Sequence, residues 1–122
     1  MMYQITNAKE FDGDTRIKWY TDEYFDLVTW IGPDDSITAF QLVYNRYRQP
    51  YALTWKSEIG YLHEKVDDGE RGGGMMKMTP ILLPDGIFRS DDVAREFFER
   101  SRELDPAVAD FVYERLKTYE GN

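Results

Sequence analysis

The sequence contains no cysteine, a single histidine and no long apolar run. Without cysteine the chain can form no disulfide bond, no thiolate metal site and no thiol nucleophile. Its apolar stretches fall short of the roughly 20 residues that a membrane-spanning helix needs. The segment Met1–Glu10 also lacks the basic start and apolar run of a signal peptide. These absences predict a cytoplasmic protein with no membrane partner.

Basic residues are also scarce. The chain has 15 lysine and arginine residues against 23 aspartate and glutamate residues, which gives a formal charge of −8. Nucleic-acid binding draws much of its affinity from basic side chains that neutralise phosphates. Nucleic acid is therefore an unfavoured partner. Binding through the Arg46–Tyr51 segment stays open, and its affinity would fall steeply with added salt.

The residues that are present are typical of a folded globular protein. A length of 122 residues suits one domain, over residues 1–122. Hydrophobic residues make up 42% of the chain and charged residues 31%, as in other globular proteins. Aromatic residues make up 16%, which is more flat apolar surface than a small core readily takes up. We therefore expect some aromatic side chains at a groove or a subunit interface.

Apolar residues recur with a period of two from Thr15 to Asp67, which is the spacing of half-buried strands. The segments Tyr24–Ile31 and Ser36–Asn45 are rich in β-branched and aromatic residues, and a turn at Gly32–Asp35 separates them. This pattern predicts an antiparallel β-meander of about five strands, within a sheet region of about residues 15–83.

The turn at Gly32–Asp35 has proline at its second position, which predicts a tight hairpin. If the two ends of this turn pair, Leu27 lies opposite Phe40, and Trp30 lies opposite Ile37 on the other face. Continuing the alternation gives one face an apolar set: Phe25, Leu27, Phe40, Leu42, Leu53, Trp55, Leu62 and Val66. The other face is expected to carry a mixed set: Val28, Trp30, Ala39, Gln41, Val43, Lys56, His63 and Lys65.

A Gly-rich loop over residues 68–74 follows, and the apolar period then changes to about 3.6. Ser90 is a suitable N-cap for one helix, and Asp105-Pro106 can cap and start a second. The apolar stripes of the two helices are Val93, Ala94, Phe97, Phe98 and Leu104, then Val108, Phe111, Val112, Leu116 and Tyr119. We expect a two-helix hairpin over about residues 90–120, packed on the Phe40 face of the sheet. The predicted fold class is α+β.

His63 is the candidate catalytic residue, because histidine is the residue type that changes charge near neutral pH. Acidic residues follow it, but alternation along a strand turns Glu64 to the opposite face and places Asp67 roughly 13 Å away. The sequence therefore predicts no metal site and no cofactor. Unless partners come from other strands, His63 is interpreted as a solvated residue of the sheet face.

The segment from Tyr44 to Tyr51 interleaves arginine with tyrosine at the end of a hairpin. Arg46, Tyr47, Arg48 and Tyr51 are candidate binding residues, because guanidinium and phenol groups can stack and hold anions. The alternative is that Tyr44 belongs to the core and the arginines offset the acidic surface. We favour this alternative, since such hairpins are common without a ligand.

Four segments of the chain resemble a group of short bacterial proteins of unassigned function: Tyr24–Leu27, Phe40–Tyr44, Ala52–Trp55 and Lys77–Leu82. The similarity extends from about Arg16 to Leu116. It implies a free-standing bacterial protein and carries no activity, cofactor or site residue.

Two functional hypotheses follow. The first is a non-catalytic binding or interaction domain that forms a homodimer through exposed aromatic residues such as Trp30. Surplus aromatic surface and few catalytic residue types favour it over an enzyme. The second is a small enzyme or small-molecule-binding protein with a site near His63, Arg46 and the Gly-rich loop.

Overall fold

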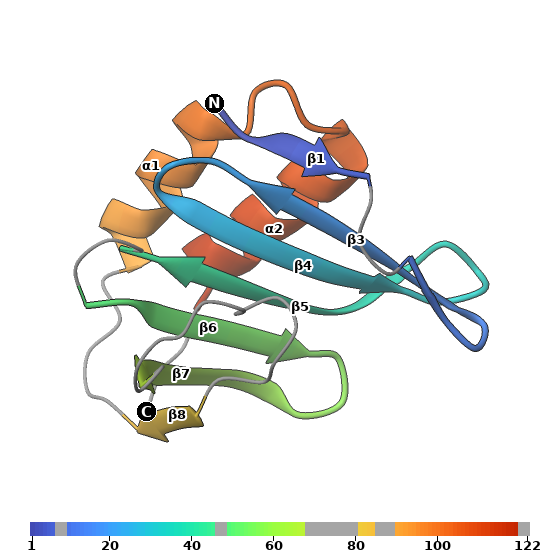
Figure 1. Ribbon diagram of the computed structural model, residues 1–122, viewed down its shortest axis with the longest axis horizontal. Coiled ribbons are helices and arrows are strands. Elements are labelled where there is room, and N and C mark those ends of the chain that lie inside the picture. Colours follow the sequence, from blue (N-terminus) through green and yellow to red (C-terminus); the bar gives the residue numbers. More distant parts are fainter. Residues whose placement is uncertain (7–9, 46–48, 68–80, 85–89, 120–122) are drawn as a thin grey trace.

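The computed structural model describes residues 1–6, 10–45, 49–67, 81–84 and 90–119. These residues form eight strands followed by two helices (Figure 1). The strands are β1 (Tyr3–Ile5), β2 (Phe11–Asp12), β3 (Thr15–Thr21), β4 (Phe25–Ile31), β5 (Ile37–Tyr44), β6 (Tyr51–Lys56), β7 (Gly60–Asp67) and β8 (Ile81–Pro84). The helices are α1 (Ser90–Arg100) and α2 (Pro106–Lys117).

Five consecutive strands form the centre of the sheet, which confirms the predicted meander. Strands β3 to β7 pair antiparallel in chain order, and β8 continues the sheet beyond β7. At the other edge, β1 and β2 both pair with β3, so two short segments line one strand. The sheet is open, with β1 and β8 at its two ends (Figure 1).

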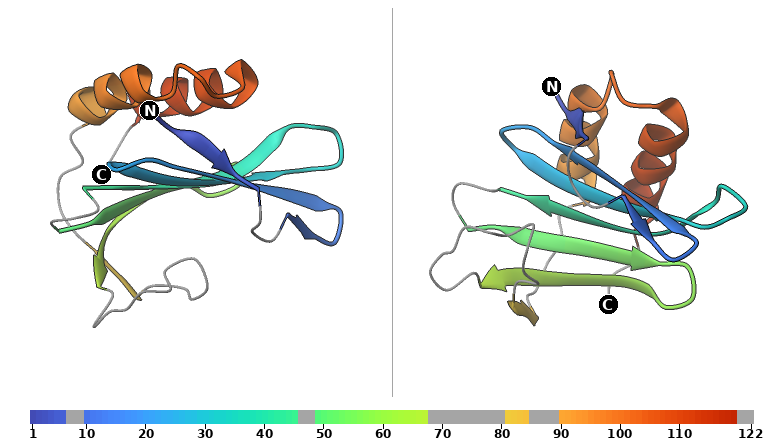
Figure 2. Two further views of the ribbon diagram at one scale, coloured as in Figure 1. Left: turned by 45° about the horizontal axis from the view of Figure 1, so that its top comes forward. Right: turned by 45° about the vertical axis from the view of Figure 1, so that its right-hand side comes forward.

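The two helices cover one face of the sheet, as their apolar stripes predict (Figure 2). Asp105 caps α2, because its carboxylate accepts a hydrogen bond from the Ala107 backbone N–H at 3.0 Å. The buried core between the two layers includes Phe25, Leu27, Phe40, Leu42, Leu53, Val93, Phe97, Val108, Val112 and Leu116. The α+β fold class and the packing of the helices on the Phe40 face are thus confirmed.

The sheet is bent, and its β7–β8 end turns away from the helices (Figure 2). We call the surface opposite the helices the helix-free face. Cross-strand pairing gives this face one row formed by Ile17, Trp30, Ala39 and Lys56. The next row on the same face is formed by Trp19, Val28, Gln41, Thr54 and Leu62.

The register of the β4–β5 hairpin differs from the prediction. Gly32 forms backbone hydrogen bonds with two residues: its N–H donates to the Ser36 carbonyl at 2.9 Å, and its carbonyl accepts from the Asp35 N–H at 2.9 Å. The loop therefore has three residues, Pro33 to Asp35, and Asp35 has a positive φ of 69°. A second irregularity lies between Trp30 and Ile31. The three-residue loop and the irregularity together shift the register by two residues, so Leu27 lies opposite Leu42, not Phe40. Because side chains alternate with a period of two, a shift of two leaves Leu27, Trp30, Ala39 and Phe40 on their predicted faces. Ile37 changes face, since it pairs with Ile31 and packs against the core under the helices.

The predicted faces of β7 are wrong. Lys56 pairs with Gly60, whose φ of 101° suits glycine at the end of the turn, and Tyr61 therefore lies opposite Trp55. This one-residue difference reverses every side chain of the strand. The residues that change to the helix-covered face are His63 and Lys65, and those that change to the helix-free face are Leu62 and Val66.

One helical residue also departs from its predicted stripe. Phe98 is 50% exposed and packs beside Tyr113 of α2, with ring centroids 5.2 Å apart, whereas Phe97 is fully buried. A helix turns by about 100° per residue, which places Phe98 on the side of α1 next to α2 rather than beside Phe97 in the core. Neither α1 nor α2, the helices of the described part of the chain, combines the length and apolar character needed to cross a lipid bilayer.

Candidate functional site

Three rings from adjacent strands stack on the helix-covered face. Tyr44 ends β5, Tyr51 begins β6, and His63 lies in β7. The ring centroids are 5.7 Å apart for Tyr44 and Tyr51, 5.5 Å for Tyr51 and His63, and 6.0 Å for Tyr44 and His63. The ring planes differ by at most 26°. We call these three residues the ring stack.

A hydroxyl–imidazole contact lies inside the ring stack. The Tyr44 hydroxyl and His63 Nε2 are 2.7 Å apart, and the two residues are 9% and 8% exposed. The hydroxyl can donate to the imidazole or accept from it, depending on the tautomer. Such a pair can hold or pass a proton, and it also satisfies two polar groups that would otherwise destabilise the interior.

The ring stack corrects the interpretation of His63 as a solvated residue. The register of β7 turns His63 toward the helices, where Tyr51, a candidate binding residue, lies beside it. Sequence reasoning missed Tyr44 as the partner of His63, because 19 residues separate them and only the pairing of three strands brings them together. The available signal was the pair of tyrosines that flank the turn between β5 and β6.

The other residues predicted for this site are not placed. Arg46, Tyr47 and Arg48 lie outside the described residues, and so does the Gly-rich loop over 68–74. A site that combines them with His63 therefore stays a prediction. Within the described residues, no group of three or more histidine, aspartate or glutamate side chains could hold a metal ion.

Trp30 lies on the helix-free face, which is the face predicted for it. Its cross-strand neighbours are Ile17 of β3 and Ala39 of β5, and Trp19 and Val28 occupy the next row. Ile17 and Val28 are buried, at 6% and 8% exposed, whereas both tryptophans are partly exposed. Ile17, Trp19, Val28 and Trp30 form an uncharged apolar area that we call the tryptophan patch.

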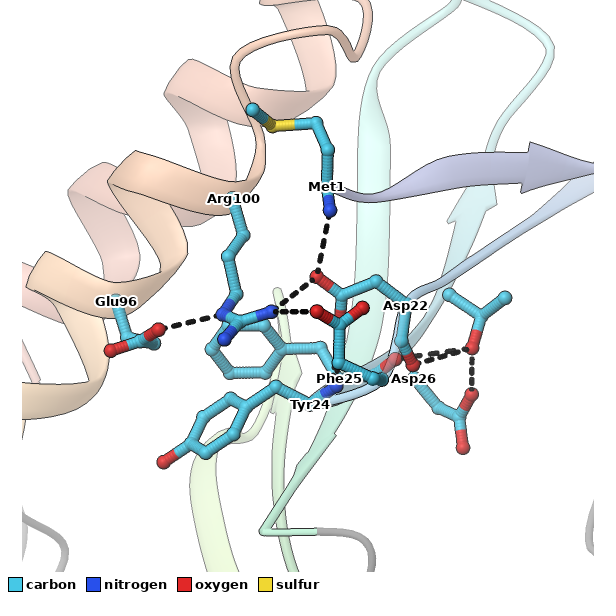
Figure 3. Close-up of polar contacts among 9 residues, drawn as sticks. Met1, Asp22, Tyr24, Phe25, Asp26, Glu96 and Arg100 are labelled. Atoms are coloured by element: carbon cyan, nitrogen blue, oxygen red, sulfur yellow. Dashed lines mark hydrogen bonds and ion pairs between the residues drawn. The ribbon is translucent and has the colours of Figure 1, made fainter.

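A network of charges surrounds Arg100, the last residue of α1, where this helix meets the β3–β4 turn (Figure 3). Its Nε donates to Glu96 at 2.6 Å, and one terminal nitrogen contacts Asp22 at 3.1 Å and Glu23 at 3.2 Å. The hydrogen bond with Glu96, followed by those with Asp22 and Glu23, raises the pKa of Arg100 above its ordinary value. The amino group of Met1 lies 3.9 Å from Oδ2 of Asp22, the same carboxylate oxygen that Arg100 contacts.

Asp22 uses its other carboxylate oxygen to hold the turn between β3 and β4. This Oδ1 accepts hydrogen bonds from the backbone N–H groups of Tyr24 and Phe25 at 2.7 and 2.8 Å. The Arg100 guanidinium also lies over the Tyr24 ring, 5.1 Å from its centroid. The contacts of Arg100 with Asp22 and Glu23 join α1 to the β3–β4 turn, whereas its contact with Glu96 lies within α1. We therefore interpret the network as a structural attachment of α1.

The chain was also compared with protein families, curated proteins and solved structures. No family model matches the chain, and neither a curated protein nor a solved structure matches it.

Proposed function

We propose that this protein is a non-catalytic binding domain that associates with a second copy of itself through the helix-free face. The supporting observation is the tryptophan patch, whose two partly exposed indoles occupy diagonal positions on neighbouring strands. An antiparallel sheet with one solvated face usually carries polar side chains on that face. Tryptophan is instead enriched at protein interfaces. The patch is therefore better suited to contact with protein than with water.

The tryptophan patch is a surface at which a second copy can approach without direct contact between like charges. The chain carries a formal charge of −8, and two copies repel each other wherever their acidic surfaces approach. The tryptophan patch has no charged side chain. A two-fold contact that places the patch of one copy against the patch of the other brings only uncharged groups together at its centre.

The contact must extend beyond the patch, because a standard interface buries about 800 Å² per partner. One of the two rows continues to Ala39 and Lys56, and the other continues to Gln41, Thr54 and Leu62. The Gln41 side-chain amide already donates to the Thr54 hydroxyl at 3.0 Å, so these polar groups can enter an interface with a hydrogen bond made. Two sheets that pack face to face lie about 10 Å apart, and the small side chain of Ala39 allows such an approach.

The substitution Trp30→Lys tests this proposal. It places a charge at the centre of the contact, and two such charges face each other in a two-fold dimer. We expect the dimer to dissociate at least tenfold more readily, which is about 1.4 kcal/mol. Phe98→Lys is the matched control, since Phe98 is 50% exposed but lies on α1, one of the two helices that cover the opposite face of the sheet. Size-exclusion chromatography with light scattering measures both variants.

Two results would contradict the proposal. One is a Trp30→Lys variant that dimerises as well as the unchanged protein while its circular dichroism shows a native fold. The other is a Phe98→Lys variant that loses the dimer to the same extent as Trp30→Lys, because the tryptophan patch would then have no special part in the contact.

The ring stack supports a second candidate function, the binding or conversion of a small molecule near His63. The specific observation is the 2.7 Å contact between the Tyr44 hydroxyl and His63 Nε2. Native mass spectrometry of the protein purified from its own host tests it. A stoichiometric bound mass that His63→Asn removes would support this function. A ligand-free spectrum, or a bound mass that is kept in the variant, would count against the site.

The proposal places the protein in the cytoplasm of a bacterium. The cysteine-free composition suits a reducing compartment, and the resemblance to short bacterial proteins supports the origin. Fractionation of the host cells checks the location, and recovery from the periplasm or the medium would contradict it.

A further inference from the structure

Arg115 of α2 is held on an aromatic platform. Its guanidinium carbon lies 4.7 Å from the ring centroid of Phe111 and 5.1 Å from that of Trp55. The two rings themselves pack edge to face, with centroids 5.2 Å apart. Phe111 precedes Arg115 by one helical turn on the same side of α2, and Trp55 comes from β6. One face of the cation is therefore covered by rings from both layers of the fold.

The backbone of Arg115 is fixed as well. Its carbonyl belongs to the last turn of α2 and accepts a hydrogen bond from the Tyr61 hydroxyl at 2.8 Å. Tyr61 of β7 lies opposite Trp55 of β6, so this strand pair contacts both the guanidinium and the backbone carbonyl of Arg115. A side chain held in this way loses little conformational freedom when it binds a ligand.

Among the partly covered arginines that the structure describes, Arg115 differs from Arg16 and Arg100 in having no acidic partner. Arg100 contacts three carboxylates, and Arg16 forms an ion pair with Asp35. Among the described residues, no carboxylate or carbonyl accepts a hydrogen bond from the Arg115 guanidinium, and its Nε is buried without a partner. A cation that has lost part of its water is stabilised by an ion pair, and the two rings compensate only in part.

We infer that Arg115 is the anchor of a binding site for a small oxyanion, a carboxylate or a phosphate group. The guanidinium presents its N–H donors in a planar fork that matches the oxygens of both groups. The rings of Trp55 and Phe111 hold the plane of this fork, and Arg115 retains enough exposure for a ligand to reach it. The site is independent of the tryptophan patch, because Trp55 and Tyr61 lie on the opposite face of the sheet.

The test follows the Nε–Hε signal of Arg115 by ¹H–¹⁵N NMR spectroscopy. The protein is titrated with sodium acetate and, separately, with sodium phosphate, and sodium chloride keeps the ionic strength constant. We expect a saturable shift of the Arg115 signal and of the Trp55 indole signal with at least one of the two anions. Saturation by acetate alone assigns a carboxylate site, and saturation by phosphate alone assigns a phosphate site.

Two variants sharpen the test. Arg115→Lys keeps the charge but loses the fork, and we expect its affinity for the anion to fall several-fold. Arg102→Gln removes an exposed arginine between the helices and is expected to leave the titration unchanged. The inference is overturned if the signals of Arg115 and Trp55 shift no more than chloride alone shifts them, or if Arg102→Gln weakens binding as much as Arg115→Lys does.

Discussion

Tyr20 is a buried phenol, and burial controls its ionisation. The residue is 3% exposed, and burial together with the nearby carboxylate of Asp105 raises the pKa of Tyr20 to about 12 from an ordinary value of 10.0. Below pH 10 the phenol keeps its proton in both the folded and the unfolded state. Above pH 10 the unfolded state loses the proton first, so the free energy of unfolding falls as the pH rises toward 12.

The substitution Tyr20→Phe removes this pH dependence. A difference of about two units corresponds to roughly 2–3 kcal/mol of stability that the unchanged protein loses between pH 10 and pH 12. We expect the variant to lose less over the same range in urea unfolding experiments. Tyr3→Phe is the control, because Tyr3 is 60% exposed. Equal pH dependence in the unchanged protein and in Tyr20→Phe would show that another group controls alkaline unfolding.

At the scale of single elements, strands β3 to β7 and the two helices could be predicted because their signals are local, whereas the short strands β1 and β2 were not predicted. The alternation in Tyr24–Ile31 and the cap at Asp105-Pro106 depend on residues that are neighbours in the sequence. The registers could not be predicted in the same way. They depend on whether the loop after Gly32 has two residues or three, and on where the turn before Gly60 ends. The amino-acid sequence of each turn is compatible with either turn length, so it does not decide the register.

For the candidate sites, too, the features that depend on local alternation were predicted and those that depend on strand register were not. Trp30 was assigned to the correct face because it alternates with the core residues Phe25 and Leu27 of β4, before the irregularity at Ile31. His63 was assigned to the wrong face because a single residue in a turn sets the orientation of all of β7. The partners Tyr44 and Arg115 were missed, since each meets its neighbours only after strands or layers pack together.

The attachment of α1 to the sheet gives a prediction at this scale. Asp22→Asn keeps an acceptor for the N–H groups of Tyr24 but removes the charge that faces Arg100. Because Arg100 is 24% exposed and keeps two other carboxylates, we expect a loss of about 1–2 kcal/mol of unfolding free energy rather than the larger cost of an isolated buried charge.

Asp92→Asn is the matched control for this prediction. It breaks an exposed ion pair with Arg95 within α1, and such pairs contribute little. Urea unfolding measures both variants. If Asp22→Asn were no less stable than Asp92→Asn, the Arg100 network would not be what fastens α1 to the β3–β4 turn.

The whole molecule combines a high negative charge with an uncharged patch on its helix-free face. Repulsion between two copies acts over the distance that salt screens, about 10 Å at 0.1 M. Contact through the tryptophan patch depends on apolar burial, which salt does not weaken. Added sodium chloride should therefore strengthen self-association. An interface built from ion pairs would respond in the opposite direction.

Sedimentation equilibrium of the unchanged protein at low and at high sodium chloride concentration tests the proposed self-association most directly. The account predicts a molar mass that rises with protein concentration from 14.4 kDa toward twice that value, and that rises at lower protein concentration when salt is added. A mass of 14.4 kDa under every condition, or a dimer that salt dissociates, would contradict it.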